Sequence, residues 1–400
     1  MNVKKGTFTA ATGTGDQTVS GIGFTPKAVM IWTSYQTAAG FTDGYLFQIG
    51  MSDGTRQNSA YSRTDDNTSP NDCDTTRSNT QICLVRNVAG TNVRVGTLSS
   101  FGSGQFVLNW TTVDSAVIFH YIAFGGTDLS VHVDEFITSA GTGFVPIAGF
   151  SFTPIAAILV QVPSISDRCN FPNIGWFTRN VNGTIGQGSF ALNVEDAQAT
   201  QDTFRYQRTV RCTSLLESVA STIFNDTSYT QLGFGLNTFS GSATPTTYFM
   251  VFGNISAYAT SLLQPTATGS QAITGSGFTP KLLILSSVGQ TAQTTVQANA
   301  KESFGAGDGS SQGWEYCGSN DAVNPSEAVG GHNTSNIVVM ATPNATGAST
   351  TIQAEASLTS LDSDGFTLNW GTADATQREV IAFMIGDVIS SGGGEHSSVF

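Results

Sequence analysis

The sequence predicts an all-β protein made of three tandem antiparallel β-sandwich domains with a jelly-roll-like arrangement. Composition gives the first indication, because 39% of the 400 residues are hydrophobic while only 11% are charged. The chain therefore has enough apolar material for a core but too few charges to pattern long amphipathic helices. Its polar residues are mainly Thr, Ser, Asn and Gln, which suit the faces of strands and the turns between them.

An internal repeat supplies the domain organisation. Three markers recur in the same order: Phe-Thr-Pro at residues 24, 152 and 278, Phe-x-Leu-Asn at residues 106, 234 and 366, and an apolar run that ends in glycine at residues 125, 253 and 386. Their spacing of about 128 residues is the size of an ordinary domain. We therefore expect domains at residues 1–128, 129–258 and 259–388, followed by a Gly/Ser-rich C-terminal tail at residues 389–400.

The strands of one repeat can be followed in order in the first copy. Residues 18–23 alternate and then turn, and Pro26 fixes φ where the next strand begins. Residues 28–32 form a continuous apolar run, typical of a strand that is buried on both faces. A strand at residues 45–49 ends before an Asp-Gly turn, and two further strands are expected at residues 106–110 and 117–124. A short helix is expected only at residues 214–220.

The C-terminal tail has the composition of a flexible linker, and its last two residues are the apolar Val399 and Phe400. We expect these two residues to anchor the tail in an apolar pocket of a neighbouring subunit or a larger particle. The alternative is that the tail folds back on the third domain.

Charge and hydropathy exclude two classes of partner. The formal net charge is −13 and the chain has no cluster of Lys and Arg, so a nucleic-acid partner is not expected. No apolar run of about 18 residues is present, so no membrane insertion is expected. The N-terminal segment also lacks the apolar region of a secretory signal, which predicts a chain that folds in the cytoplasm.

The five cysteines lack the C-x-x-C spacing of a zinc site. Because a chain of this size can build its own core, free thiols are expected. Two pairings remain open, Cys73 with Cys83 and Cys169 with Cys212.

No catalytic, cofactor or metal site is expected, and the protein is predicted not to be an enzyme. The four histidines, His120, His132, His332 and His396, do not occupy equivalent positions in two repeats and are interpreted as structural. Neighbouring carboxylates on a strand point to opposite faces, which prevents their cooperation as a catalytic pair.

Aromatic residues give the only candidate binding surface. Trp110 and Trp370 alternate with apolar residues and are expected in the core. The candidates for a surface-binding patch, with a host-surface glycan as the ligand, are Tyr35, Trp176, Trp314 and Tyr316.

The segment at residues 12–29, with Gly-Asp-Gln-Thr-Val-Ser-Gly-Ile-Gly-Phe-Thr-Pro at its centre, is followed about 80 residues later by Gly-Gln-Phe-Val-Leu-Asn-Trp. This pattern resembles β-rich repeat modules of tailed-bacteriophage virion proteins, and the resemblance covers residues 6–386. The middle copy departs from it, with Gly-Phe-Val-Pro at residues 143–146 and no Trp after Asn237.

The resemblance implies a non-enzymatic structural protein on the surface of a bacteriophage virion, either a capsid decoration protein or a tail-associated module. Such a protein is assembled in the host cytoplasm, contacts other virion proteins, and is present as a homo-oligomer or in many copies. The alternative is a receptor- or glycan-binding adhesin at the tail tip. A depolymerase is a third interpretation.

Overall fold

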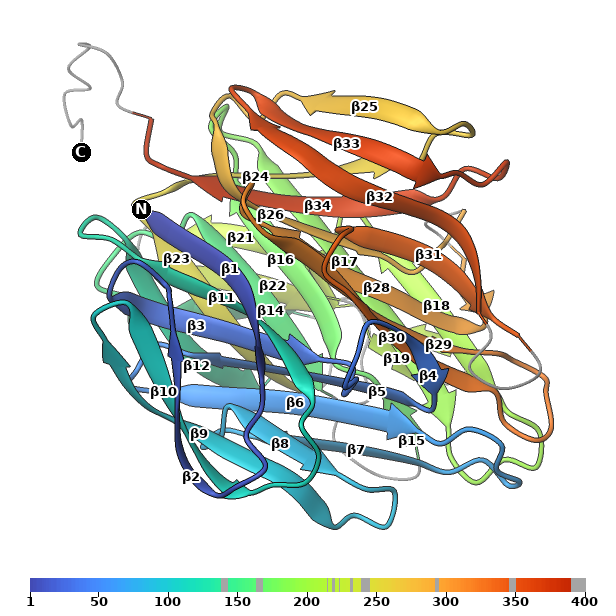
Figure 1. Ribbon diagram of the computed structural model, residues 1–400. Coiled ribbons are helices and arrows are strands. Elements are labelled where there is room, and N and C mark those ends of the chain that lie inside the picture. Colours follow the sequence, from blue (N-terminus) through green and yellow to red (C-terminus); the bar gives the residue numbers. More distant parts are fainter. Residues whose placement is uncertain are drawn as a thin grey trace.

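The computed structural model describes residues 1–137, 143–162, 168–213, 215–217, 220–222, 224–230, 233–238, 245–291, 295–344 and 350–389. Every regular element in these ranges is a β-strand, and the strands form several antiparallel sheets (Figure 1). The helix expected at residues 214–220 is wrong, because residues 215–217 and 220–222 pair as two short strands. Val399 and Phe400 lie outside the described residues.

The first part of the chain forms a six-stranded and a four-stranded sheet. The large sheet has the order β1 (Asn2–Thr9), β11 (Ile118–Gly125), β3 (Pro26–Thr33), β5 (Tyr45–Ser52), β6 (Gln57–Thr64) and β7 (Cys73–Ser78). The small sheet has the order β2 (Gly15–Ser20), β10 (Gln105–Thr112), β9 (Asn92–Gly102) and β8 (Cys83–Arg86).

The second part forms a large sheet with the order β12 (Ser130–Ile137), β23 (Thr246–Gly253), β14 (Ala156–Val162), β16 (Asn173–Arg179), β17 (Ile185–Glu195) and β18 (Thr203–Arg208), and β15 (Arg168–Asn170) also pairs with β17. Its small sheet has the order β13 (Gly143–Ala148), β22 (Gly233–Thr238) and β21 (Phe224–Thr230). The strands β19 (Leu215–Glu217) and β20 (Ala220–Thr222) form a separate hairpin.

The third part repeats the arrangement. Its large sheet has the order β24 (Ser256–Leu263), β34 (Glu379–Gly386), β26 (Pro280–Ser287), β28 (Ala300–Gly307), β29 (Gln312–Ser319) and β30 (Ala328–Asn333). Its small sheet has the order β25 (Gly269–Thr274), β33 (Gly365–Thr372), β32 (Thr350–Asp362) and β31 (Val338–Pro343). Because β24 already begins at Ser256, this sheet starts slightly before the expected boundary at residue 259.

Each large sheet is buried on both faces, which explains its continuous apolar strands. In β3, Ala28, Met30 and Trp32 face one central core, whereas Val29 and Ile31 face the small sheet of the same part of the chain. The strands β14 and β26 alternate in the same way, so the central core contains residues of all three large sheets. Since alternate side chains of a strand point to opposite faces, one apolar run serves two cores.

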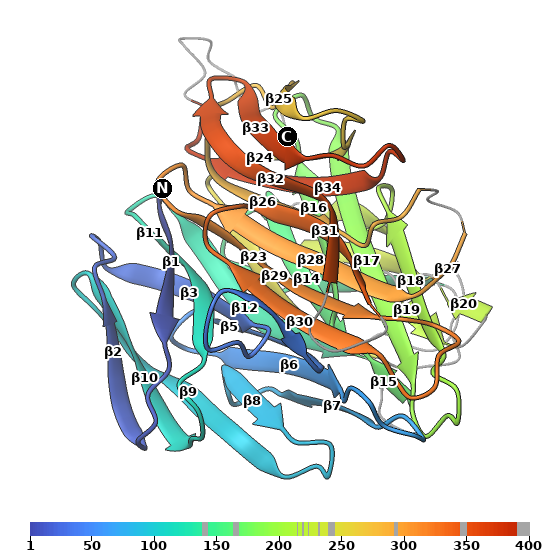
Figure 2. The same ribbon diagram turned by 45° about the vertical axis from the view of Figure 1, so that its right-hand side comes forward.

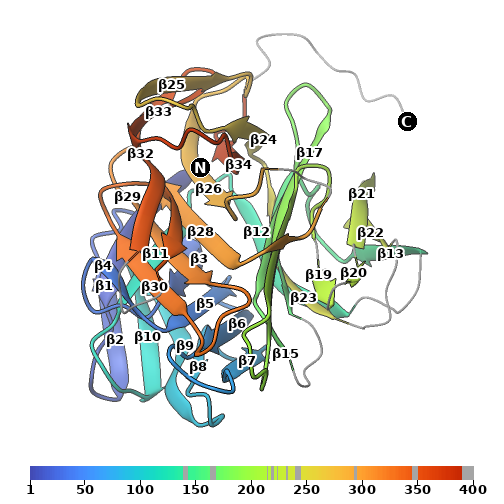
Figure 3. The same ribbon diagram turned by 90° about the vertical axis from the view of Figure 1, so that its right-hand side faces the viewer.

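The small sheets have one buried face. In β10, Phe106, Leu108 and Trp110 are fully buried while Val107 and Asn109 between them are partly exposed, as expected for a sheet with one face in water. Trp370 of β33 is likewise buried, which confirms the core placement expected for both tryptophans. Figure 3 shows the small sheet of β13, β22 and β21 as a layer separate from the large sheet that contains β17.

Two of the three large sheets receive an edge strand from another part of the chain. The strand β4 (Gly40–Asp43) follows β3 of the first sheet but pairs with β30 of the third. The strand β27 (Gln297–Ala298) follows β26 of the third sheet but pairs with β18 of the second (Figure 2). The corresponding segment of the second sheet contains β15, which pairs with β17 of its own sheet and lies beside β7 of the first. Each exchanged segment covers an edge that would otherwise be open.

The phenylalanine of the Phe-Thr-Pro marker lies against a glycine in all three copies. A Cβ added to Gly125, Gly253 or Gly386 would lie within 2.3–2.7 Å of the phenylalanine ring of Phe24, Phe152 or Phe278, respectively. The glycine that ends each repeat is therefore needed so that the ring can lie against the strand. Burial differs between the copies, because Phe278 is buried whereas Phe24 and Phe152 are partly exposed.

The cysteine expectation is wrong for Cys73, which is disulfide-bonded. Cys83, Cys212 and Cys317 are buried thiols. Neither of the two pairings left open by the sequence is therefore present, since each of them would need Cys83 or Cys212.

Candidate functional site

The structure contradicts the expected surface patch at three of its four residues. Trp176, Trp314 and Tyr316 are at most 1% exposed, because they lie on large sheets with both faces covered. Phe41 of the exchanged strand β4 packs on Trp314 and Tyr316, with ring centroids 5.6 Å apart in both pairs. These two aromatic residues therefore hold an exchanged strand. Tyr35 is partly exposed, and its hydroxyl donates to Asp114.

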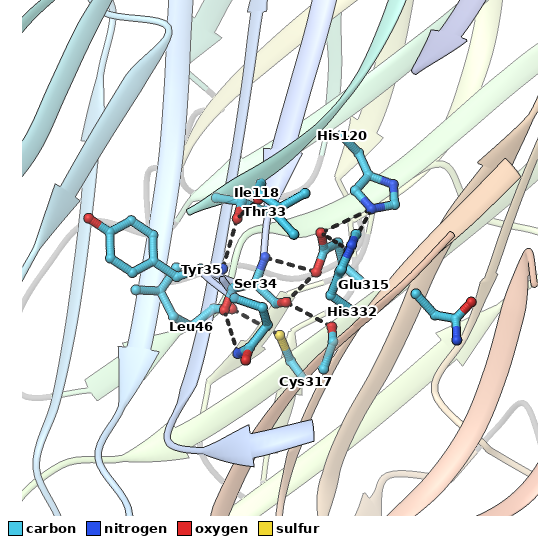
Figure 4. Close-up of polar contacts among 12 residues, drawn as sticks. Thr33, Ser34, Tyr35, Leu46, Ile118, His120, Glu315, Cys317 and His332 are labelled. Atoms are coloured by element: carbon cyan, nitrogen blue, oxygen red, sulfur yellow. Dashed lines mark hydrogen bonds and ion pairs between the residues drawn. The ribbon is translucent and has the colours of Figure 1, made fainter. Parts of the chain in front are cut away.

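The four aromatic residues therefore do not form one binding site. A cluster of ionisable side chains lies elsewhere in the structure. His120, Glu315 and His332 bring one ligand atom each to within 4.8 Å of one another, the one such group of His, Cys, Asp or Glu found among the described residues. Figure 4 shows the three side chains converging from different strands. We call them the His-Glu-His cluster.

The three atoms of the His-Glu-His cluster form a compact triangle. His120 Nε2 lies 2.7 Å from His332 Nδ1, and His332 Nδ1 lies 3.1 Å from Glu315 Oε1. The third edge, from His120 Nε2 to Glu315 Oε1, is 3.3 Å. Their side chains are 0%, 3% and 1% exposed for His120, His332 and Glu315, respectively, so bulk water does not reach the triangle.

Strand alternation positions these residues. His120 lies on β11 between Phe119 and Tyr121, which face the first small sheet, so His120 itself points into the centre of the molecule. Glu315 and His332 are direct cross-strand partners on β29 and β30 of the third large sheet. The cluster is therefore a contact between the first and third large sheets.

Polar groups around the cluster hold Glu315 in place. The backbone N–H of Ser34 donates to Glu315 Oε2 over 3.1 Å, and the Ser34 hydroxyl also contacts that oxygen. The same hydroxyl lies 2.7 Å from the carbonyl oxygen of Gly331. Glu315 therefore keeps Oε1 directed at the two histidines while Oε2 is occupied.

Burial governs the protonation of the cluster. Desolvation holds the pKa of His120 well below its usual range, with smaller contributions from Lys5 and His332. Desolvation also raises the pKa of Glu315, partly offset by its contacts with His332 and Ser34. Lys5, which is fully buried beside the cluster, has a pKa lowered to about 8 by burial, and its ammonium donates to the carbonyl of Gln312 over 2.7 Å. His120 is consequently a neutral imidazole with a lone pair available.

Sequence reasoning missed this cluster. The sequence predicts separate structural roles for His120 and His332, and no local pattern marks Glu315 or Ser34 as a site residue. The available signal was a set of ionisable residues in otherwise apolar strands, since buried strands rarely carry them without a partner. The cluster forms only because two large sheets pack together. His120 is 195 residues from Glu315 and 212 residues from His332 in the chain.

A second feature is a polar cavity of about 420 Å³ between the first and second large sheets. Its lining includes Arg56, Asn79, Asp134, Glu135 and Tyr248. Arg56 forms an ion pair with Asp134, and the Asn79 amide donates to Glu135 over 2.9 Å. The cavity thus presents charged and amide groups together with one aromatic ring.

Comparison with known proteins leaves the family open. No protein-family model matches the chain, and no curated protein sequence matches it. The described ranges contain no helix of the length and hydropathy needed to cross a bilayer.

Proposed function

We propose that the chain is a non-enzymatic structural protein whose three parts are tandem copies of one jelly-roll-like β-sandwich. In this proposal residues 1–128, 129–258 and 259–388 act as three protomers of a pseudo-trimer that is covalently joined. The proposed location is the surface of a tailed-bacteriophage virion, as a capsid decoration or a tail-associated protein. Its partners are other virion proteins, and it is present in many copies.

A cycle of contacts between the three parts, made by two exchanged edge strands and one side-by-side contact, is the observation that carries the proposal. The first part gives β4 to the third, the third gives β27 to the second, and the second places β15 beside the first. A head-to-tail contact that closes after three steps is the pattern of a cyclic trimer. A central core shared by all three large sheets adds a large apolar interface to this exchange. Such a body is suited to a rigid structural role.

The sequence motifs support the same interpretation. The order of the strands is equivalent in the three large sheets, with the last long strand of each part inserted between its first and third. The glycines at residues 125, 253 and 386 and the rings that they accommodate recur in each part. Repetition of this packing motif in all three parts favours a structural role as the shared property.

Mass spectrometry and cryo-EM of purified particles test the location. We expect the protein to remain with particles through density-gradient purification and to appear as a body with approximate threefold symmetry on the capsid or tail. Absence of the protein from particles that are otherwise complete would contradict the virion proposal. A particle-bound density with three unequal, unrelated lobes would contradict the pseudo-trimer alone.

The polar cavity favours a second candidate function, a host-receptor or glycan-binding adhesin at the tail tip. The amide and carboxylate groups of Asn79, Asp134 and Glu135 in this cavity offer hydrogen-bond partners for the hydroxyl groups of a sugar. A glycan array with the wild-type chain and with Asn79→Ala tests this function. A glycan bound by the wild type and lost in the variant would support the adhesin, and an array without any specific signal would reject it.

A further inference from the structure

We propose that the His-Glu-His cluster binds one zinc ion, which joins the first large sheet to the third. His120 Nε2, His332 Nδ1 and Glu315 Oε1 are the three protein ligands. The proposal does not depend on a virion location, because it rests on the geometry of the cluster alone.

The triangle is slightly smaller than the donor spacing around a tetrahedral zinc ion. Zinc lies about 2.0–2.2 Å from nitrogen and oxygen ligands, so two ligands at the tetrahedral angle are about 3.3 Å apart. The edges of the triangle are 2.7, 3.1 and 3.3 Å. An ion slightly outside the plane of the three atoms reaches all of them with small side-chain movements. Three protein ligands leave the fourth position to a water molecule.

A single N–H shared between two acceptors can serve at most two edges of the triangle, so hydrogen bonding leaves one edge without a proton. A neutral imidazole carries a single N–H, and a carboxylate oxygen only accepts. If His120 Nε2 donates to His332 Nδ1, then His332 Nδ1 has no proton for Glu315 Oε1, and one edge brings two lone pairs together. A cation at the centre attracts all three lone pairs at once.

The donor set selects the metal. Two imidazoles and one carboxylate suit zinc and neighbouring transition metals, whereas calcium and magnesium prefer sites built from oxygen alone. Two histidines with one glutamate are a known ligand set for zinc. Because all three side chains are buried, the ion would be shielded from bulk solvent.

The three proposed ligands differ in the hydrogen bonds that fix their orientation. Ser34 fixes Glu315 through the carboxylate oxygen that the metal does not use. His120 Nδ1, by contrast, has no hydrogen-bond partner among the described residues. Lys5 opposes the added charge, but its ammonium is bound to the Gln312 carbonyl. Ser34 is therefore a positioning residue for the site.

Metal titration of the full chain tests the proposal. The wild type is stripped with a chelator and then titrated with ZnCl₂, while bound metal is measured by mass spectrometry and stability by the thermal midpoint. Cobalt(II) serves as a spectroscopic probe, because four-coordinate cobalt absorbs visible light strongly. We expect one ion per chain, a rise of the midpoint with zinc, and a four-coordinate cobalt spectrum.

Variants assign the ligands. His332→Gln should weaken zinc binding at least a hundredfold, and Ser34→Ala should weaken it about 10–100-fold. His132→Gln is the matched control, because His132 lies outside the cluster near Asp53 and Asp134, and it should bind zinc as the wild type does.

Two outcomes would overturn the proposal. One is a folded, stripped wild type that takes up no stoichiometric zinc and shows no change of midpoint. The other is a folded His332→Gln variant that binds zinc as tightly as the wild type. If His332→Gln does not fold, Glu315→Gln replaces it, because the amide keeps the shape of the side chain, and unchanged zinc affinity in Glu315→Gln would equally reject the site.

Discussion

Replacing Gly305 by alanine tests the contact between the large and small sheets of the third part. Gly305 lies in β28, and its φ is not in the left-handed region, so the backbone itself tolerates alanine. An added Cβ would stand 1.9 Å from the carbonyl oxygen of Ile337, where real Cβ atoms stay at least 3.0 Å away. The neighbouring atom belongs to the backbone, so a rotamer change cannot relieve the clash.

The expected cost follows from what must move. Ile337 is fully buried, and its N–H donates to the carbonyl of Ala356 over 2.9 Å. Overpacking of a core costs about 1–3 kcal/mol, and loss of a buried hydrogen bond adds about 1 kcal/mol. We expect Gly305→Ala to lower the free energy of unfolding by about 3 kcal/mol.

Gly371→Ala is the matched control in the same part of the chain. Gly371 lies on the exposed face of β33, and an added Cβ would meet nothing within 4 Å. Restricting the unfolded chain should make this variant equal to the wild type or more stable by about 0.4–1 kcal/mol. Differential scanning calorimetry and urea titration of both variants measure the difference. If Gly305→Ala lies within 0.5 kcal/mol of Gly371→Ala, the close approach of Ile337 is refuted.

Three further predictions concern buried groups. Neither carboxylate oxygen of Glu302 has a hydrogen-bond partner among the described residues, and burial raises the pKa of Glu302 well above 4.5. Glu302→Gln should therefore stabilise the protein at pH 7, and this gain in stability should shrink as the pH falls toward 4.5. Urea titrations at several pH values measure the gain, and its absence at pH 7 would contradict the prediction. Burial and the nearby Arg205 and Arg378 lower the pKa of Lys301 from 10.5 to about 7, so between these values the unfolded chain binds the extra proton and stability rises with pH. This rise of stability with pH reaches about 1.4 kcal/mol per pH unit, and Lys301→Met should flatten it. An unchanged slope of the thermal midpoint against pH in Lys301→Met would reject the prediction. Phe106 is fully buried, so Phe106→Ala should lower the free energy of unfolding by about 3–5 kcal/mol. Phe24→Ala should lower it by less, because Phe24 is partly exposed. Calorimetry that shows the reverse order would be inconsistent with the burial of these two residues.

The sequence alone predicts the strands well, because local patterns report which faces of a strand are buried. The run at residues 28–32 is continuous and belongs to a strand with two buried faces, whereas Phe106, Leu108 and Trp110 alternate with partly exposed residues. These patterns depend only on the two-residue period of a strand and on the hydrophobic effect. The disulfide at Cys73 and the burial of Trp176 were not predictable in this way, because both depend on which segments face each other across sheets.

The tertiary structure alone decided which distant residues meet. Nothing near His120 in the sequence indicates Glu315 or His332, since their contact arises where two large sheets pack around a common core. The same packing buries Trp314 and Tyr316 under the exchanged strand β4, although their sequence surroundings suggested an exposed position. The sequence by itself therefore determined the strands and the repeat, whose information is local or periodic. The central core, the strand exchange and the His-Glu-His cluster come from the packing of sheets against one another, which local periodicity does not encode.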